Sequence, residues 1–273
     1  MTGPVDGWGV VASLALVCLA VAVSLWLRLG LARSIAWAGL RAAVQLFAVG
    51  AVFRLIFESA RARPFAWMWV VGMILVAAEV VQRRRAQITG LRKWALAALA
   101  LSTGVALGVL FGLGVFDDEP VAIVVIAGIT IGNVLPATIL AIDRVAARLR
   151  EAPERVEGLL ALGFDARQVM RFIAPEAAAT ALTAQIERTK VVGLIALPGA
   201  MTGLLLAGVD PVDAVMVQLV VMYLILGAVT LSVSVVTAAA VSASFADGLR
   251  LPEWSRVPDD GALTGRRRRR LRE

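Results

Sequence analysis

Polar side chains inside long apolar stretches are costly in a lipid environment, so the few that occur here mark candidate binding positions. Arg41 and Gln45 are four residues apart and share one face of a helix. Arg41 lies a turn or two inside the edge of its apolar stretch, where it either extends its guanidinium to lipid headgroups or lines a polar path. Both interpretations stay open on the sequence alone.

Asn133 is the polar residue of a second stretch, and the residues around it favour a local weakness in the helix. Gly128 and Gly132 precede it and Pro136 follows it, a pattern in which a helix can loosen and expose carbonyl groups. The same glycines also suit close packing between helices. Asn133 is therefore a candidate for contact with a solute, beside a packing role for the glycines.

A third group of candidates lies around a predicted break near residue 198. Glu187 and Lys190 are neighbours on one helical face and either pair with each other or meet a solute. Pro198 and Gly199 interrupt the next apolar run, and Met201 follows the break. Its soft thioether can touch a metal, although a methionine in an apolar core usually fills space.

Catalytic chemistry and a strong metal site find no support in the sequence. The chain has no histidine and one cysteine, Cys18, which excludes an intramolecular disulfide. No C-x-x-C pair or dense carboxylate group occurs within the apolar stretches, so any metal ligands remain unknown. The chain is not expected to be an enzyme, and no catalytic residue is predicted.

The elements that hold these residues are membrane spans. The chain is 60% hydrophobic and 17% charged, with a mean hydropathy of +0.84, which indicates an integral membrane protein. A span needs about 20 apolar residues. We predict an all-α polytopic protein with about seven transmembrane helices, approximately Trp8–Leu27, Ile35–Phe57, Pro64–Val81, Trp94–Phe116, Pro120–Ile142, Val191–Val209 and Val212–Phe245.

The basic residues predict the orientation of the spans. Arginines and lysines gather in alternate loops and at the C-terminus, as in Arg83–Arg85 and Arg266–Arg270, while acidic residues occupy most of the opposite loops. The positive-inside rule then places the N-terminus outside and the C-terminus in the cytoplasm. Because topology and contact with the lipid bilayer account for the net charge of +7, nucleic-acid binding is not needed. We expect one membrane domain over residues 1–251 and a basic, disordered tail over 252–273.

A charged loop over residues 143–175 separates the fifth and sixth predicted spans. It predicts two short helices joined at Gly163, which suits the left-handed conformation that ends many helices. Asp165 and Gln168 are spaced as a capping box for the second helix, and Pro175 is expected to interrupt it. The first helix has an apolar side that includes Leu160. The loop is either a docking elbow for a soluble partner or a solvated connector.

The order and spacing of Glu157, Gly163 and Pro175 resemble the EAA-type cytoplasmic loop of ABC transporter permeases. Three further segments sharpen the match: LRAAVQLFAVG at Leu40–Gly50, AGITIGNVLPATILAIDRV at Ala127–Val145, and ERTKVVGLIALPGAMTGLLLAGVDP at Glu187–Pro211. Together they are similar to the FetB-type family of iron-export ABC permeases, which includes plant permease subunits linked to aluminium tolerance. The resemblance runs from the second span to the seventh.

The resemblance implies a permease subunit of an ABC exporter in the cytoplasmic membrane that moves iron or another metal outward. It implies a coupling helix that fits an ABC ATPase subunit, with the coupling contacts at Glu157, Leu160, Gly163, Asp165 and Pro175. ATP and Mg would bind to that partner, since no G-x-x-x-x-G-K-[ST] loop occurs in this chain and no cofactor of its own is expected. One such subunit supplies half of an ABC membrane domain, so a homodimer is expected. The alternatives are a non-metal small solute and an ATP-independent secondary transporter.

Overall fold

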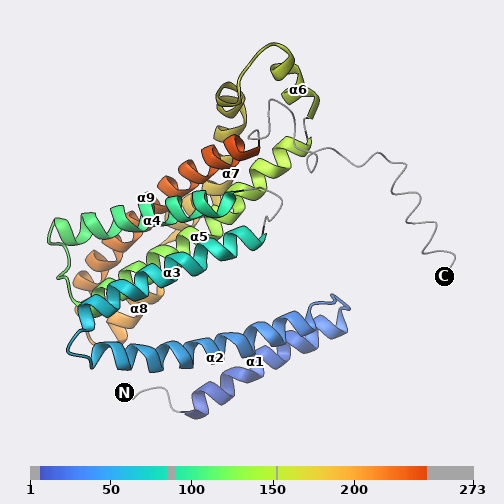
Figure 1. The fold of residues 1–273 in the computed structure, drawn as a ribbon. Helices are drawn as coiled ribbons and strands as arrows, with labels where there is room; N and C mark the ends of the chain where they lie inside the picture. Colours follow the sequence, from blue (N-terminus) through green and yellow to red (C-terminus); the bar gives the residue numbers. More distant parts are fainter. Residues whose placement is uncertain (1–6, 85–89, 152, 245–273) are drawn as a thin grey trace. The chain divides into compact units, whose positions relative to one another are not determined.

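The computed structural model describes residues 7–84, 90–151 and 153–244, and these residues are folded almost entirely into helices (Figure 1). Two compact units are found, divided between Phe65 and Ala66. Within the described residues the β contact is an isolated bridge between Val192 and Ala196. The predicted all-α class is therefore confirmed. The predicted tail over residues 252–273 lies outside the described residues.

The first unit is a pair of apolar helices, α1 (Gly7–Trp26) and α2 (Ala32–Phe57), which pack against each other. A short turn that contains Gly30 in the left-handed conformation joins them. The helices approach closely at Gly39, where a Cβ atom would lie 3.3 Å from Cγ1 of Val17. A small residue at this position lets the two backbones come together.

The second unit is built around two long helices, α5 (Pro120–Glu151) and α9 (Pro211–Ser244). Most of α3 (Ala62–Arg84) belongs to this unit, and α4 (Leu91–Gly112), α6 (Pro153–Ala161), α7 (Ala166–Val191) and α8 (Gly199–Leu206) complete it. Helix α9 packs against α4, α5, α7 and α8, and α5 packs against α4 and α7 (Figure 1). The core of the unit therefore lies between α5, α9 and their neighbours.

Small and branched apolar residues fill this core, which is what close packing of helices in lipid requires. On α5 and α9 the fully buried residues include Val134, Ile142, Val229 and Val233. Backbone groups in a bilayer must form hydrogen bonds within their own helix, and the first N–H groups of a helix have no such partner. Helices α5 and α9 both begin at a proline, which has no N–H group and so leaves one fewer donor without a partner.

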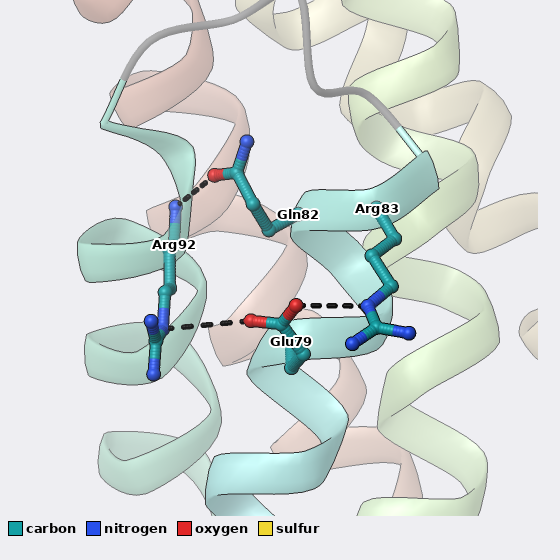
Figure 2. Close-up of polar contacts among 4 residues, drawn as sticks. All are labelled: Glu79, Gln82, Arg83 and Arg92. Atoms are coloured by element: carbon teal, nitrogen blue, oxygen red, sulfur yellow. Dashed lines mark hydrogen bonds and ion pairs between the residues drawn. The ribbon is translucent and has the colours of Figure 1, made fainter.

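The end of α3 is fastened to the start of α4 by polar side chains (Figure 2). The Gln82 side-chain oxygen accepts the backbone N–H of Arg92 at 2.7 Å, which satisfies one of the free donors at the start of α4. Glu79 accepts a bond from Nε of Arg83 at 2.8 Å and lies 3.7 Å from Nε of Arg92. Glu79 is thus an ion-paired residue of this junction.

Five helices, α2, α3, α4, α5 and α9, are long and apolar enough to cross a membrane, and α1 contains a shorter apolar segment, Val11–Trp26. These six match six of the predicted spans to within a few residues, except that α5 continues nine residues beyond Ile142. The protein is a multi-pass membrane protein.

The predicted span Val191–Val209 is wrong as a single helix. Helix α7 ends at Val191, residues 192–198 form an irregular segment, and α8 has only 8 residues. Gly193 takes a left-handed conformation, and Pro198 precedes the first turn of α8, so the helix cannot run through this segment. The break expected at Pro198 and Gly199 is confirmed.

Two contacts show the register between the antiparallel helices α5 and α7. Arg148 pairs with Glu176 near the elbow, and Arg188 bonds to Asn133 farther along. At 1.5 Å per residue, Asn133 lies about 20 Å from the start of α5 at Pro120. Asn133 is therefore near the middle of the apolar part of α5, and Val191 ends α7 at nearly the same level. The irregular segment and α8 extend from that level toward the start of α9.

Candidate functional site

A polar cavity of about 240 Å³ lies between α5 and α7. Helix α5 contributes Gly132, Asn133, Pro136, Ala137 and Leu140, and α7 contributes Ala181, Ala184, Gln185 and Arg188. The α7 residues recur at positions i, i+3, i+4 and i+7, so they form one face of that helix. At about 30 Å³ per water molecule, the cavity has room for about eight waters or one small solute.

The polar groups of this cavity are mostly hydrogen-bond donors. Nη1 of Arg188 donates to Oδ1 of Asn133 at 3.2 Å, and Nδ2 of Asn133 donates to the Ile129 carbonyl at 2.7 Å. Gln185 is only 9% exposed, and no partner for its side-chain amide is found among the described residues. The asparagine thus orients the arginine, while the glutamine amide remains available to a solute.

Pro136 adds an acceptor to the same cavity. Proline has no N–H, so the Gly132 carbonyl one turn earlier cannot receive its usual helical bond. Helix α5 nevertheless continues through Pro136, so the loosening expected around Asn133 does not break the helix. A Cβ atom on Gly132 would meet no other atom within 4 Å, because this glycine borders the open cavity. A Cβ atom on Gly128 would also meet no other atom within 4 Å, so neither glycine serves close packing within the described chain.

Glu187 and Lys190 lie on α7 next to the cavity face and form an ion pair, with Nζ of Lys190 2.8 Å from Oε1 of Glu187. The mutual pairing that the sequence left open is therefore found. Their position differs from the expected entrance of a span, because α7 has already reached the middle level of α5 at these residues. Met201 is half-buried on α8, beyond the break.

Arg41 and Gln45 are placed on α2 in the first unit, and both side chains are exposed. They share a helix face, as their spacing predicts. The second unit, by contrast, brings Asn133 together with Gln185 and Arg188, two residues that were not among the predicted candidates.

Sequence reasoning missed Gln185 and Arg188 because it began the sixth span at Val191 and left the preceding polar residues outside the membrane. A signal was present in the helical spacing of Ala181, Ala184, Gln185 and Arg188, which places two small residues beside two polar ones. Such a face is typical of a helix that borders a polar cavity.

A helical elbow lies at the other end of α5. Helix α6 ends at Ala161, and Gly163, two residues farther on, has a φ angle of +86°. The N–H of Gly163 donates to the Leu160 carbonyl at 3.0 Å, and the N–H of Phe164 donates to the Leu159 carbonyl at 3.1 Å. These two bonds form the Schellman motif, so the predicted left-handed turn is confirmed.

The second half of the elbow is the start of α7. Asp165 accepts the backbone N–H of Gln168 at 2.8 Å, and the Gln168 side chain accepts the N–H of Asp165 at 2.8 Å, so the predicted capping box is confirmed. Pro175 was expected to end this helix, and that expectation is wrong: α7 continues to Val191. Packing against both α5 and α9 holds the helix together across the proline, despite the missing backbone bond.

The elbow presents a mixed surface. Glu157 is exposed, and Leu162 is 76% exposed, an unusual state for a leucine outside the apolar spans. Leu160 is half-buried and packs on the core of the second unit. On α5, Arg148 pairs with both Glu151 and Glu176, and so links the base of the elbow to α7.

No group of three or more potential metal ligands is found among the described residues. The fold and the site together define a class: a polytopic α-helical membrane protein with a cavity between α5 and α7 and a helical elbow at one end.

Residues 8–245 match the model of one family, the Uncharacterised protein family (UPF0014). The chain belongs to this family. It is 35% identical over 224 residues to "UPF0014 membrane protein STAR2" of Oryza sativa subsp. japonica, covering 81% of this chain and 78% of that protein.

Two other relatives have more specific names. The chain is 30% identical over 220 residues to "Probable iron export permease protein FetB" of Escherichia coli, covering 81% of this chain and 85% of that protein. It is 30% identical over 221 residues to "Protein ALUMINUM SENSITIVE 3" of Arabidopsis thaliana, covering 81% of each. No solved structure is significantly similar to the chain.

Proposed function

We propose that this chain is the membrane subunit of an ATP-driven exporter that moves iron or another metal outward across the cytoplasmic membrane. The observation that carries the proposal is the α6 elbow, in a protein whose Escherichia coli relative is named "Probable iron export permease protein FetB". The chain lacks a phosphate-binding loop of the G-x-x-x-x-G-K-[ST] type, so a separate ATPase subunit supplies the energy and binds ATP and Mg.

The elbow suits a coupling role because its parts are rigid and its outer surface is free for a partner. The Schellman turn at Gly163 and the capping box at Asp165 fix the angle between α6 and α7. Glu157 and Leu162 remain exposed for contact with the ATPase. A short helix held in a cleft moves as a rigid body when ATPase subunits close on nucleotide.

A homodimer is part of the proposal. Irregular backbone at membrane depth is tolerated only where protein or a water-filled path covers it. In the irregular segment between α7 and α8, Leu194 is 89% exposed and Ile195 is 84% exposed, so the described part of this chain leaves the segment uncovered. A second copy would supply this cover and the other half of the membrane domain.

The test is reconstitution in proteoliposomes of the full chain with its partner ATPase. We expect iron to stimulate ATP hydrolysis and ATP to drive iron across the bilayer. The control is the same preparation with an ATPase variant that binds but does not hydrolyse ATP. Iron movement at an undiminished rate in that control would contradict the ATP-driven mechanism.

The same assay separates the candidate substrates. Stimulation by a non-metal solute and none by any metal would replace the metal assignment while leaving the exporter assignment intact. An ATP-independent secondary transporter has less support, since Glu79, a carboxylate in an apolar span, is held in ion pairs at the α3–α4 junction.

A further inference from the structure

The cavity between α5 and α7 has a charge that does not suit a bare metal cation. Of its nine lining residues, Arg188 is the one that carries a charge, and none is acidic. No carboxylate pairs with Arg188 within the described part of the chain. A divalent cation in this cavity would meet a positive charge without a negative ligand to offset it.

The residues next to the cavity on α7 do not offset its positive charge. Glu187 is neutralised by its ion pair with Lys190 on the adjacent face of α7, so the net charge at this level of the helix remains positive. Arg188 is exposed and lies level with Asn133, near the middle of the apolar part of α5. If α7 crosses the membrane, this charge is at a depth where charged groups mark solute paths.

We infer that this cavity binds the oxyanion group of a small solute, so that any metal carried by the protein passes it as an anionic chelate and not as a free cation. The inference rests on the proposed function and names the substrate class for it. A guanidinium matches the two oxygens of a carboxylate or a phosphate with two parallel hydrogen bonds.

The other polar groups fit such a ligand. Gln185, a residue that is only 9% exposed, lines the cavity and supplies a further donor with its side-chain amide, for which no partner is found in the described structure. The Gly132 carbonyl, released by Pro136, supplies an acceptor for a hydroxyl group of the solute. The hydrogen bond from Arg188 to Asn133 holds the guanidinium in place before the ligand arrives.

The test measures binding by calorimetry to the full chain in lipid nanodiscs, without any ATPase. The probes are citrate, ferric citrate, inorganic phosphate and ferrous chloride, so the carboxylate, chelate, phosphate and free-cation arms are separate. We expect either citrate or inorganic phosphate to bind. Binding of citrate would identify a carboxylate as the ligand group, and binding of phosphate would identify a phosphate.

Two substitutions act on the site in different ways. Arg188→Gln removes the charge, and Asn133→Asp is isosteric but places a carboxylate beside Arg188 that competes with the ligand. We expect each to weaken oxyanion binding at least tenfold, and Arg188→Lys to retain part of the affinity. The matched control is Arg84→Gln, which removes the same charge from an exposed position on α3 and should leave the affinity unchanged.

Three results would overturn the inference: no oxyanion binding, oxyanion affinities that are equal in all variants, or ferrous binding that Arg188→Gln leaves unchanged or strengthens. A folded state of each variant is verified by its thermal melting curve. Because the measurement needs neither ATP nor a partner, its outcome is independent of the transport assay. Oxyanion binding without ATP-driven transport of any solute would leave the cavity assignment standing and reject the exporter.

Discussion

Gly163 shows how one residue sets the geometry of the elbow. Its φ angle of +86° lies in the left-handed region, which costs other residues about 1–2 kcal/mol. A Cβ atom at this position would meet nothing within 4 Å, so the cost of a substitution comes from the backbone and not from a clash. Glycine is therefore required for conformational reasons alone.

We expect Gly163→Val to destabilise the elbow by about 1–2 kcal/mol and to reduce ATP-coupled transport, because a β-branched residue strains the left-handed turn. The measurement is transport per ATP hydrolysed in proteoliposomes. The control is Gly158→Ala on α6, where the backbone is helical and a Cβ atom is also free of contacts. That substitution should favour the helix by about 0.5–1 kcal/mol. Equal coupling in the two variants would contradict a role for the turn.

At the scale of elements, α5 and α7 work as a pair. The ion pair between Arg148 and Glu176 joins them near the elbow, and the hydrogen bond between Arg188 and Asn133 joins them at the cavity. Helix α7 begins at the elbow and lines the cavity with its other end. A displacement of the elbow would therefore be transmitted to the cavity through this one helix. This continuity depends on α7 remaining intact at Pro175.

The Arg148–Glu176 pair can be isolated with a double-mutant cycle of Arg148→Gln and Glu176→Gln. Both side chains are about half exposed, 41% and 55%, so we expect a coupling energy of only about 0.5–1 kcal/mol in thermal unfolding. Arg148→Gln should cost more than Glu176→Gln, because it also removes the pair with Glu151. A coupling energy of zero would show that helix packing alone holds α5 to α7.

Element pairing also explains two buried hydroxyls of the core. Thr138 on α5 and Ser232 on α9 form a hydrogen bond of 2.9 Å, and both are fully buried. The Thr138 hydroxyl lies 2.9 Å from the Val134 carbonyl as well, so both ends of the contact satisfy part of their bonding capacity inside the bilayer.

At the scale of the molecule, the broken crossing decides the topology of the C-terminal half. If α7, the irregular segment and α8 together cross the membrane, the loop before α5 and the loop before α9 lie on the same side. The elbow then lies on the opposite side. Helix α7 has 26 residues, about 39 Å, yet its polar residues keep it below the hydropathy of the other spans.

Single cysteines test this topology. With Cys18 replaced by serine, we expect Asp117→Cys and Asp210→Cys to react with a membrane-impermeant maleimide from outside the cell. Glu157→Cys on α6 should react only after the membrane is opened, since the positive-inside rule places the elbow in the cytoplasm. Labelling of positions 157 and 210 from the same side would mean that α7 and α8 do not cross the membrane.

Several features of this protein were determined by its sequence alone, because they depend on neighbours along the chain. Apolar stretches long enough for the bilayer predicted six of the helices, since each helix satisfies its own backbone bonds in lipid. The turn at Gly163 and the cap at Asp165 were predicted for the same reason: a left-handed glycine and a capping box are local arrangements.

Only the tertiary structure decided where α7 ends and what it faces. Hydropathy placed the sixth span at Val191–Val209, but packing against α5 and α9 extends the helical part N-terminally through Pro175 and ends it at Val191. Arg188 and Asn133 are 55 residues apart, so no local pattern relates them. Their contact, and with it the cavity, follows from the register between two antiparallel helices, which is set by side-chain packing along their whole length.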